Sequence, residues 1–155
     1  RTPAETLAAL DTFAAQVEGA PFATVVCVVF DRPSGTVTCA TAGHPPALVV
    51  GPRGHRWLDR NSGPPLAVSV GTPRVDVTEP VHDDEVLVLY TDGLIERRDE
   101  SIDTGLTRLA DAATKLFENG AQTIADRLLE DLLCETSTDD DVVLVVKHLV
   151  SAPVP

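Results

Sequence analysis

One stretch of the chain has a pattern around which the other elements can be arranged. Residues 86–90, Val-Leu-Val-Leu-Tyr, are followed at once by Thr91-Asp92-Gly93. Both alternating sets of side chains in the run are apolar, which predicts a strand that is buried on both faces. Gly93 would allow the backbone to turn or to approach a ligand closely. The pattern therefore predicts a central strand whose exit presents the carboxylate of Asp92.

A second stretch repeats this pattern in the opposite direction. Residues 138–141, Thr-Asp-Asp-Asp, lead directly into the apolar residues 142–146. If the two strands are antiparallel neighbours, Asp92 and the three aspartates come together at one end of a sheet. Such carboxylates repel one another unless a cation lies between them, and a hard cation takes oxygen ligands. The same residues also fit ordinary turns and solvated loops, so the pattern alone leaves both interpretations open.

The rest of the pattern predicts an α+β fold, an antiparallel sheet packed with helices. Thr2 and Glu5 form a capping box around Pro3 and begin a helix that Gly19 ends. Short apolar runs separated by Gly and Pro turns then predict an antiparallel meander. Apolar residues at helical spacing predict two later helices. The predicted strands are 22–30, 36–41, 47–50, one that begins at 55, 75–81, 86–90 and 142–146; the later helices start after Thr104-Gly105 and at Thr123, and the second ends near Cys134.

The charge of the chain limits the partners that it can bind. The 24 acidic and 12 basic residues give a formal net charge of −12. Nucleic acids and anionic membranes both require a basic surface, so neither is an expected partner. A phosphorylated substrate stays compatible with this charge where a metal ion supplies positive charge locally.

Length and cysteine content indicate the class of protein. The 155 residues suffice for one domain with its own core, which we expect over residues 1–150, followed by a tail at 151–155. No apolar stretch is long enough to span a membrane. Cys27, Cys39 and Cys134 are odd in number and form no C-x-x-C pair, which predicts a reduced, cytoplasmic protein. Cys27 and Cys39 could face each other across a hairpin, where we favour two small buried side chains over a disulfide.

Three further polar residues, at two places in the chain, allow a functional and a structural interpretation. His44 lies between Gly43 and two prolines and could be a ligand or a proton shuttle, but a loop residue whose ring fixes a tight turn is the interpretation that we favour. Arg97 and Arg98 follow the Thr-Asp-Gly turn and fit a solvated loop. An arginine near a metal site could also hold a phosphate, so that role stays open.

Four motifs stand in a fixed order along the chain: Ala-Gly-His-Pro-Pro at 42–46, Gly-Pro-Pro-Leu at 63–66, Leu-Tyr-Thr-Asp-Gly-Leu-Ile-Glu at 89–96 and Asp-Asp-Val at 140–142. Each motif alone is weak, but the ordered set is specific. Together they resemble the SpoIIE-type branch of the metal-dependent PPM serine/threonine phosphatases, and the resemblance extends from Pro3 to Leu149. It implies a β-sandwich of two antiparallel sheets flanked by helices.

The resemblance also implies a reaction, the hydrolysis of phosphoserine or phosphothreonine on a protein by a centre of two Mn²⁺ or Mg²⁺ ions. Asp92 and Asp140 match the family's metal-binding aspartates and are the implied catalytic residues, with Gly93 beside Asp92 in the metal motif. Asp141 and Asp139 flank Asp140 and are candidates for supporting the ligands. Because the three aspartates are consecutive, the assignment to Asp140 can shift by one residue. Residues that bind the substrate stay unassigned.

The sequence departs from the family pattern in one respect. An earlier family motif, an aspartate and a glycine near Gly-His-Gly, supplies the carboxylate that bridges both metals and belongs upstream of the first helix, whereas this chain begins at Arg1, where that helix starts. We therefore expect an incomplete catalytic domain with little activity by itself, whose exposed sheet edges favour homo-oligomers. The alternative is a degenerate, non-catalytic module that acts by interaction. Retention of Asp92 and Asp140 favours the enzyme, whose substrate by family analogy would be a phosphorylated regulatory protein such as an anti-sigma-factor antagonist.

Overall fold

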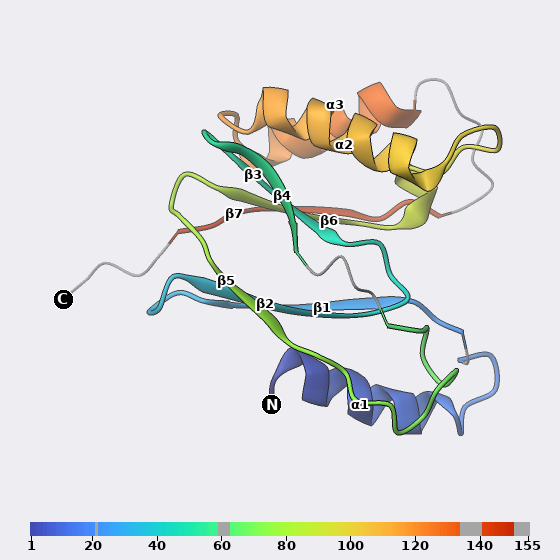
Figure 1. The fold of residues 1–155 in the computed structure, drawn as a ribbon. Helices are drawn as coiled ribbons and strands as arrows, with labels where there is room; N and C mark the ends of the chain where they lie inside the picture. The colour runs from blue at the N-terminus through green and yellow to red at the C-terminus, as the bar shows by residue number, and fades with distance from the viewer. Residues whose placement is uncertain (21, 59–62, 134–140, 151–155) are drawn as a thin grey trace. The chain divides into compact units, whose positions relative to one another are not determined.

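The computed structural model of the chain describes residues 1–20, 22–58, 63–133 and 141–150 (Figure 1). Its elements group into two compact units, and each contains antiparallel sheet and helix. The predicted α+β class is therefore confirmed. The first unit comprises Arg1–Pro46, Leu58–His82 and Val150–Pro155, and the second comprises Ala47–Trp57 and Asp83–Leu149.

The first unit begins with helix α1 (Pro3–Ala14). The predicted capping box is present, because Thr2 N donates to Glu5 Oε2 at 3.0 Å and Glu5 N donates to Thr2 Oγ1 at 3.3 Å. These bonds satisfy N–H groups that the first turn would otherwise leave without partners. The helix ends before the predicted stop at Gly19. Residues 15–19 are all exposed, so they add no burial that would extend the helix.

A three-stranded antiparallel sheet lies against α1 (Figure 1). The strand order is β1 (Val25–Asp31), β2 (Thr36–Ala42), β5 (Val77–Pro80). Leu7 of α1 packs in one cluster with Ala40 and Ala42 of the middle strand. β1 begins later than predicted because Phe22 has a φ of +71°, a left-handed conformation that an extended strand excludes.

The second unit contains a four-stranded sheet covered on one face by two helices (Figure 1). β6 pairs antiparallel with the strands on both of its sides and is buried or half-buried at every position, as predicted. The strand order is β4 (Gly54–Leu58), β3 (Ala47–Gly51), β6 (Val86–Tyr90), β7 (Leu144–His148), and the helices are α2 (Ile102–Leu116) and α3 (Ala121–Leu133). Within the described residues, no helix combines the length and apolar character that crossing a membrane requires.

The strand order corrects the predicted antiparallel meander. β2 and β3 follow each other along the chain but belong to different sheets, and β5 returns to pair with β2. Gly and Pro turns specify where the chain reverses. They do not specify which strand becomes the neighbour, because the apolar faces that are buried together decide the pairing.

Two predicted boundaries in the second unit are also wrong. α2 begins at Ile102, before Thr104-Gly105, because Ser101 is the N-cap and its Oγ accepts a hydrogen bond from Thr104 N at 3.3 Å. β7 begins at Leu144 and not at residue 142. Just before it, the backbone of Asp141 and Val143 bonds to the side-chain hydroxyl of Thr91 in place of a regular ladder.

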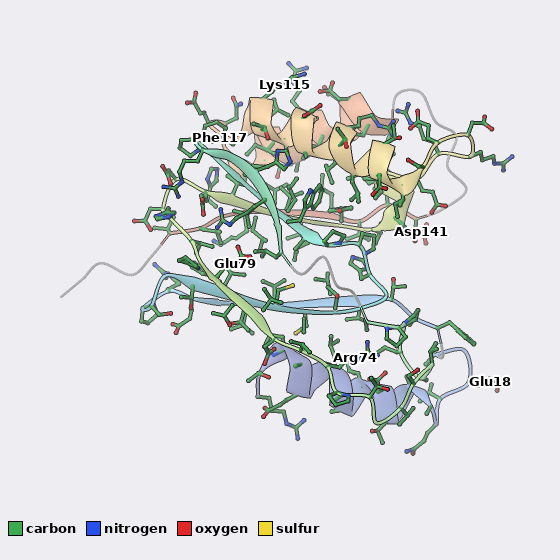
Figure 2. All side chains as sticks on the ribbon, viewed as in Figure 1. Glu18, Arg74, Glu79, Lys115, Phe117 and Asp141 are labelled. Atoms are coloured by element: carbon green, nitrogen blue, oxygen red, sulfur yellow. The ribbon has the colours of Figure 1, made fainter. Side chains whose placement is uncertain are left out.

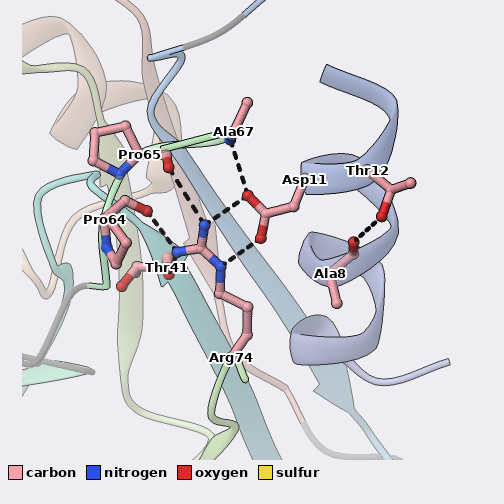
Figure 3. A network of polar contacts seen from close by, with 8 residues as sticks. All are labelled: Ala8, Asp11, Thr12, Thr41, Pro64, Pro65, Ala67 and Arg74. Atoms are coloured by element: carbon pink, nitrogen blue, oxygen red, sulfur yellow. Dashed lines mark hydrogen bonds and ion pairs between the residues drawn. The ribbon is translucent and has the colours of Figure 1, made fainter. Parts of the chain in front are cut away.

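The first unit buries a complete ion pair between α1 and the segment that leads to β5 (Figure 3). Arg74 donates from Nη2 and Nε to the two carboxylate oxygens of Asp11 at 2.8 and 2.9 Å, and the two side chains are 3% and 2% exposed. Arg74 Nη1 also donates to Pro64 O at 2.6 Å, and Ala67 N donates to Asp11 Oδ1 at 3.1 Å. The hydrogen bond from Arg74 is the main reason why the pKa of Asp11 lies below its ordinary value. The pair therefore connects α1 to residues 64–74.

We expect Asp11→Ala to lower the free energy of unfolding by about 3–5 kcal/mol, because the buried guanidinium of Arg74 loses its carboxylate. Urea denaturation at pH 7 measures this change. Asp111→Ala is the matched control, since that aspartate is also helical but exposed, and its effect should stay within about 0.5 kcal/mol.

The pH dependence checks the sign of this effect. A carboxyl group whose pKa is lowered by folding stabilises the fold above its unfolded pKa, near 3.8, and loses that contribution as the pH falls through the folded pKa. The difference in unfolding free energy between wild type and Asp11→Ala should therefore narrow below about pH 4. A small difference at pH 7, or one that widens in acid, would contradict this role of the pair.

Candidate metal centre

The two strands that carry the candidate ligands are antiparallel neighbours. β6 and β7 pair from Val86 opposite His148 to Tyr90 opposite Leu144. The exit of β6 therefore lies beside the start of β7, which meets the condition that the sequence set for bringing the carboxylates to this end of the sheet. This register brings the chain at Asp92 next to the chain that follows the three aspartates.

Thr91 ties these two segments together beyond the last ladder pair. Thr91 N donates to Val143 O at 3.0 Å, and Val143 N donates to Thr91 Oγ1 at 2.9 Å. Thr91 Oγ1 in turn donates to Asp141 O at 3.1 Å. One residue therefore makes three hydrogen bonds to the stretch 141–143.

Asp92 begins a short 3₁₀ helix, η1 (Asp92–Leu94), directly after Thr91. Its carbonyl oxygen accepts from both Ile95 N and Glu96 N at 2.8 Å, and its own Oδ1 accepts from Gly93 N at 3.0 Å. The aspartate is exposed, whereas Gly93 and Leu94 are buried. The backbone of Asp92 is thus fixed by a tight turn while its carboxylate faces solvent.

Helix α2 holds this turn from the other side. A Cβ atom at Gly105 would collide with the carbonyl group of Ile95, so only glycine permits the observed approach. Arg108 Nη2 donates to the same carbonyl oxygen at 3.1 Å, and its Nη1 donates to Glu100. Hydrogen bonding to Arg108 is also the main reason why the pKa of Glu100 is lowered. Gly105 and Arg108 therefore fix the segment that follows Asp92.

Some of the predicted site residues lie in the described part of the chain, and others lie outside it. Asp92 and Asp141 are exposed and belong to segments that Thr91 joins, and Figure 2 labels Asp141 at the end of the sheet where β6 leads into η1. Asp139 and Asp140 lie outside the described residues. No group of three or more His, Cys, Asp or Glu side chains that could hold a metal occurs in the described part of the chain. The carboxylates present fit a hard cation by their chemistry.

The remaining candidates have structural contacts. His44 is largely buried, and its Nδ1 lies 3.3 Å from Thr24 Oγ1, as expected of a ring that fixes a turn. Arg97 lies 3.8 Å from Glu100, in the loop before α2. Cys27 pairs with Ala40 in the β1–β2 register, so it does not face Cys39, and neither cysteine forms a disulfide. Burial raises the pKa of Cys27. Cys134 lies outside the described residues.

Sequence reasoning missed Thr91 and Gly105 as residues of this site. The threonine was visible as part of the Thr-Asp-Gly motif, but its partners lie 50 and 52 positions away along the chain. Gly105 was interpreted as a helix-start signal. Its role depends on the close approach of α2 to Ile95, which no local pattern contains.

Gly105→Ala should destabilise the second unit by about 1–3 kcal/mol, because the added methyl group forces α2 away from Ile95. The sign is informative, since the same substitution inside a helix ordinarily stabilises by about 0.5–1 kcal/mol. Thermal unfolding of wild type and Gly105→Ala measures this change in stability. Gly120→Ala is the control, because a Cβ there meets no atom within 4 Å. A Gly105→Ala variant as stable as wild type would contradict the packing assigned to this glycine.

The fold of the chain resembles phosphatase domains of known structure. The RsbU and RsbW domains of Rv1364c from Mycobacterium tuberculosis match with a TM-score of 0.81 and 31% sequence identity, over 99% of this chain and 44% of that one. The SiaA-PP2C domain of Pseudomonas aeruginosa matches with a TM-score of 0.75 and 18% identity, over 94% of this chain and 59% of that one. The phosphatase domain of SpoIIE from Bacillus subtilis (Mn presoaked) matches with a TM-score of 0.66 and 19% identity, over 86% of this chain and 59% of that one. The chain thus spans less than two thirds of each of these chains.

The family model described as Stage II sporulation protein E (SpoIIE) matches residues 1–149, nearly the whole sequence. The antiparallel sheets and α-helices of the described residues agree with the fold of the matched domains. The chain therefore belongs to the SpoIIE family and has the α+β fold of PP2C-type phosphatase domains.

Proposed function

We propose that this domain hydrolyses phosphoserine or phosphothreonine on a protein substrate, with Mn²⁺ or Mg²⁺ held at the end of the β6–β7 pair. The observation that carries the proposal is the set of hydrogen bonds from Thr91, the neighbour of Asp92, to Asp141 and Val143. It joins the two segments that bear the candidate ligands. Membership of the SpoIIE family supports the same chemistry.

In this proposal Asp92 and Asp140 hold the metal, with Gly93 beside them, and Asp141 and Asp139 support the ligands. Bound ions of this kind lower the pKa of a coordinated water and neutralise phosphate charge. The chain itself contributes carboxylate oxygens and a rigid sheet that sets where they stand. In the reaction, a water oxygen forms a bond to phosphorus and the bond from phosphorus to the side-chain oxygen breaks. The serine or threonine hydroxyl then leaves with a proton, and inorganic phosphate is released.

The proposed substrate is a phosphorylated regulatory protein of the anti-sigma-factor-antagonist type. One matched structure holds RsbU and RsbW domains together, which supports a regulatory protein as the partner. The net charge of −12 argues against nucleic acid. We also propose that residues 1–150 act as one domain in the cytoplasm. Cys27 and Cys39 are not in a disulfide, which is compatible with a reducing compartment.

The alternative function is a non-catalytic module that binds a partner protein. Such a module could also form a homo-oligomer in which sheet edges pair. It is favoured by the hydrogen bond that Asp92 Oδ1 accepts from Gly93 N at 3.0 Å, a local contact typical of an aspartate in a turn. Asp92 would then act only as a turn residue, and metal would not be needed.

Calorimetry with Mn²⁺ tests the metal site on this chain. We expect wild type to bind Mn²⁺ and Asp92→Asn to bind it at least about 100-fold more weakly, because the substitution removes a charged oxygen ligand. Asp84→Asn is the matched control. It removes an exposed carboxylate at the opposite end of the same strand and should leave the affinity unchanged.

Equal Mn²⁺ affinity in wild type and Asp92→Asn would contradict the assignment of Asp92. Equal losses in Asp92→Asn and Asp84→Asn would point to a general effect of net charge. Wild type that binds no Mn²⁺, alone and after extension by the upstream aspartate motif, would support the interaction module.

Phosphate release from a phosphoserine peptide tests the reaction. In a chain extended upstream by the family's bridging motif, Asp92→Asn and Asp140→Asn should each lower Mn²⁺-dependent turnover by more than about 100-fold without changing the free energy of unfolding. This chain by itself should show little turnover. Unchanged turnover in either variant would reject the role of that aspartate.

A further inference from the structure

The hydroxyl of Thr91 has an unusual set of partners for its position. Thr91 is the N-cap of η1, where a threonine hydroxyl ordinarily accepts a hydrogen bond from an N–H of the helix that it precedes. Here the side chain makes no such bond. It bonds to Val143 and Asp141 on the neighbouring segment, so the sequence uses a capping residue for a different purpose.

The hydrogen bonds show what that purpose is. In an antiparallel ladder, Val143 N would donate to the carbonyl oxygen of Thr91, its opposite residue. That carbonyl accepts instead from Leu94 N at 3.1 Å, which starts η1. Thr91 Oγ1 takes the place of the carbonyl and accepts from Val143 N at 2.9 Å. The chain can therefore turn at Asp92 while its partner segment stays bonded.

The hydroxyl also has a donor function. Its hydrogen is directed to Asp141 O at 3.1 Å, so both capacities of the hydroxyl are used by the 141–143 stretch. Asp92, which follows Thr91, and Asp141 carry like charges, which repel each other and would separate the two segments. A neutral hydroxyl holds them together without consuming either carboxylate.

We propose that Thr91 is a positioning residue of the metal centre, whose hydroxyl sets the separation between Asp92 and Asp141. This inference rests on the proposed function. It assigns Thr91 no contact with metal or substrate. Valine at this position would keep the shape and β-propensity but could not bond to Val143 N or Asp141 O, whereas serine would keep both bonds.

The test is Mn²⁺ calorimetry on Thr91→Val and Thr91→Ser, together with hydrogen exchange of the Val143 amide without metal. We expect Thr91→Val to weaken Mn²⁺ binding by about 10–100-fold, the range for residues that orient metal ligands, and to speed exchange of the Val143 amide. Thr91→Ser should stay within about threefold of wild type in both measurements. If Thr91→Val does not fold, Thr91→Ala provides a second variant without a hydroxyl.

A matched control separates positioning from a general loss of stability. Thr114→Val removes a hydroxyl from α2 that donates to Ala110 O at 2.7 Å, away from the Asp92 turn in the chain. It should leave Mn²⁺ affinity and Val143 exchange unchanged even where it lowers the free energy of unfolding.

The outcomes distinguish this inference from the proposed function. Mn²⁺ binding that is lost in Asp92→Asn but kept in Thr91→Val would overturn the inference alone. Equal losses in Thr91→Ser and Thr91→Val would overturn it too, since the hydroxyl would then not be the cause. Wild type that binds no Mn²⁺, alone and after extension by the upstream aspartate motif, would overturn both.

Discussion

The antiparallel pairing of β6 with β7 is the constraint on which the candidate site depends. Side chains alternate along a strand, so a slip of one residue would turn every side chain of β7 to the other face. The register is fixed at both ends. Thr91 and Val143 bond beyond one end of the ladder, and Leu149 N donates to Glu85 O at 2.9 Å at the other. The position of Asp92 relative to Asp141 follows from this register.

The two ends of β6 use acidic side chains in opposite ways. Glu85 is 2% exposed, and Arg56 donates to its two carboxylate oxygens at 2.7 and 2.9 Å, while Arg53 adds a third contact at 3.3 Å. A buried carboxylate requires such partners. This end therefore anchors the β3–β4 hairpin to the start of β6.

At the other end the carboxylate of Asp92 is exposed and accepts one backbone N–H, from Gly93. The structural connection there is made by the neutral hydroxyl of Thr91. Tyr90, the last residue of β6, is buried and packs edge-on against Trp57, with the two ring centroids 6.5 Å apart. Burial raises the pKa of Tyr90. An apolar strand with a rigid exit is thus combined with an acidic side chain that stays accessible, as a site for a hard cation requires.

The sequence by itself determined the local features of this protein. The capping box at Thr2 and Glu5, the doubly buried strand β6 and the acidic turn after it each arise from residues close together in the chain. The sequence also showed two apolar runs with aspartates at opposite ends, but it raised their antiparallel pairing only as a condition, which the structure then met. These features predict the α+β class and indicate the end of the sheet where a functional site is expected.

Only the tertiary structure decided which strands share a sheet, where α2 meets Ile95, and what the Thr91 hydroxyl bonds to. Each of these depends on groups that are distant in sequence: β5 returns to β2, Gly105 approaches the turn after Asp92, and Thr91 contacts Asp141. A turn signal states that the chain reverses but contains no information about its next neighbour. The buried pair of Asp11 and Arg74 was missed for the same reason, because each residue alone reads as a surface charge and only packing brings the two together.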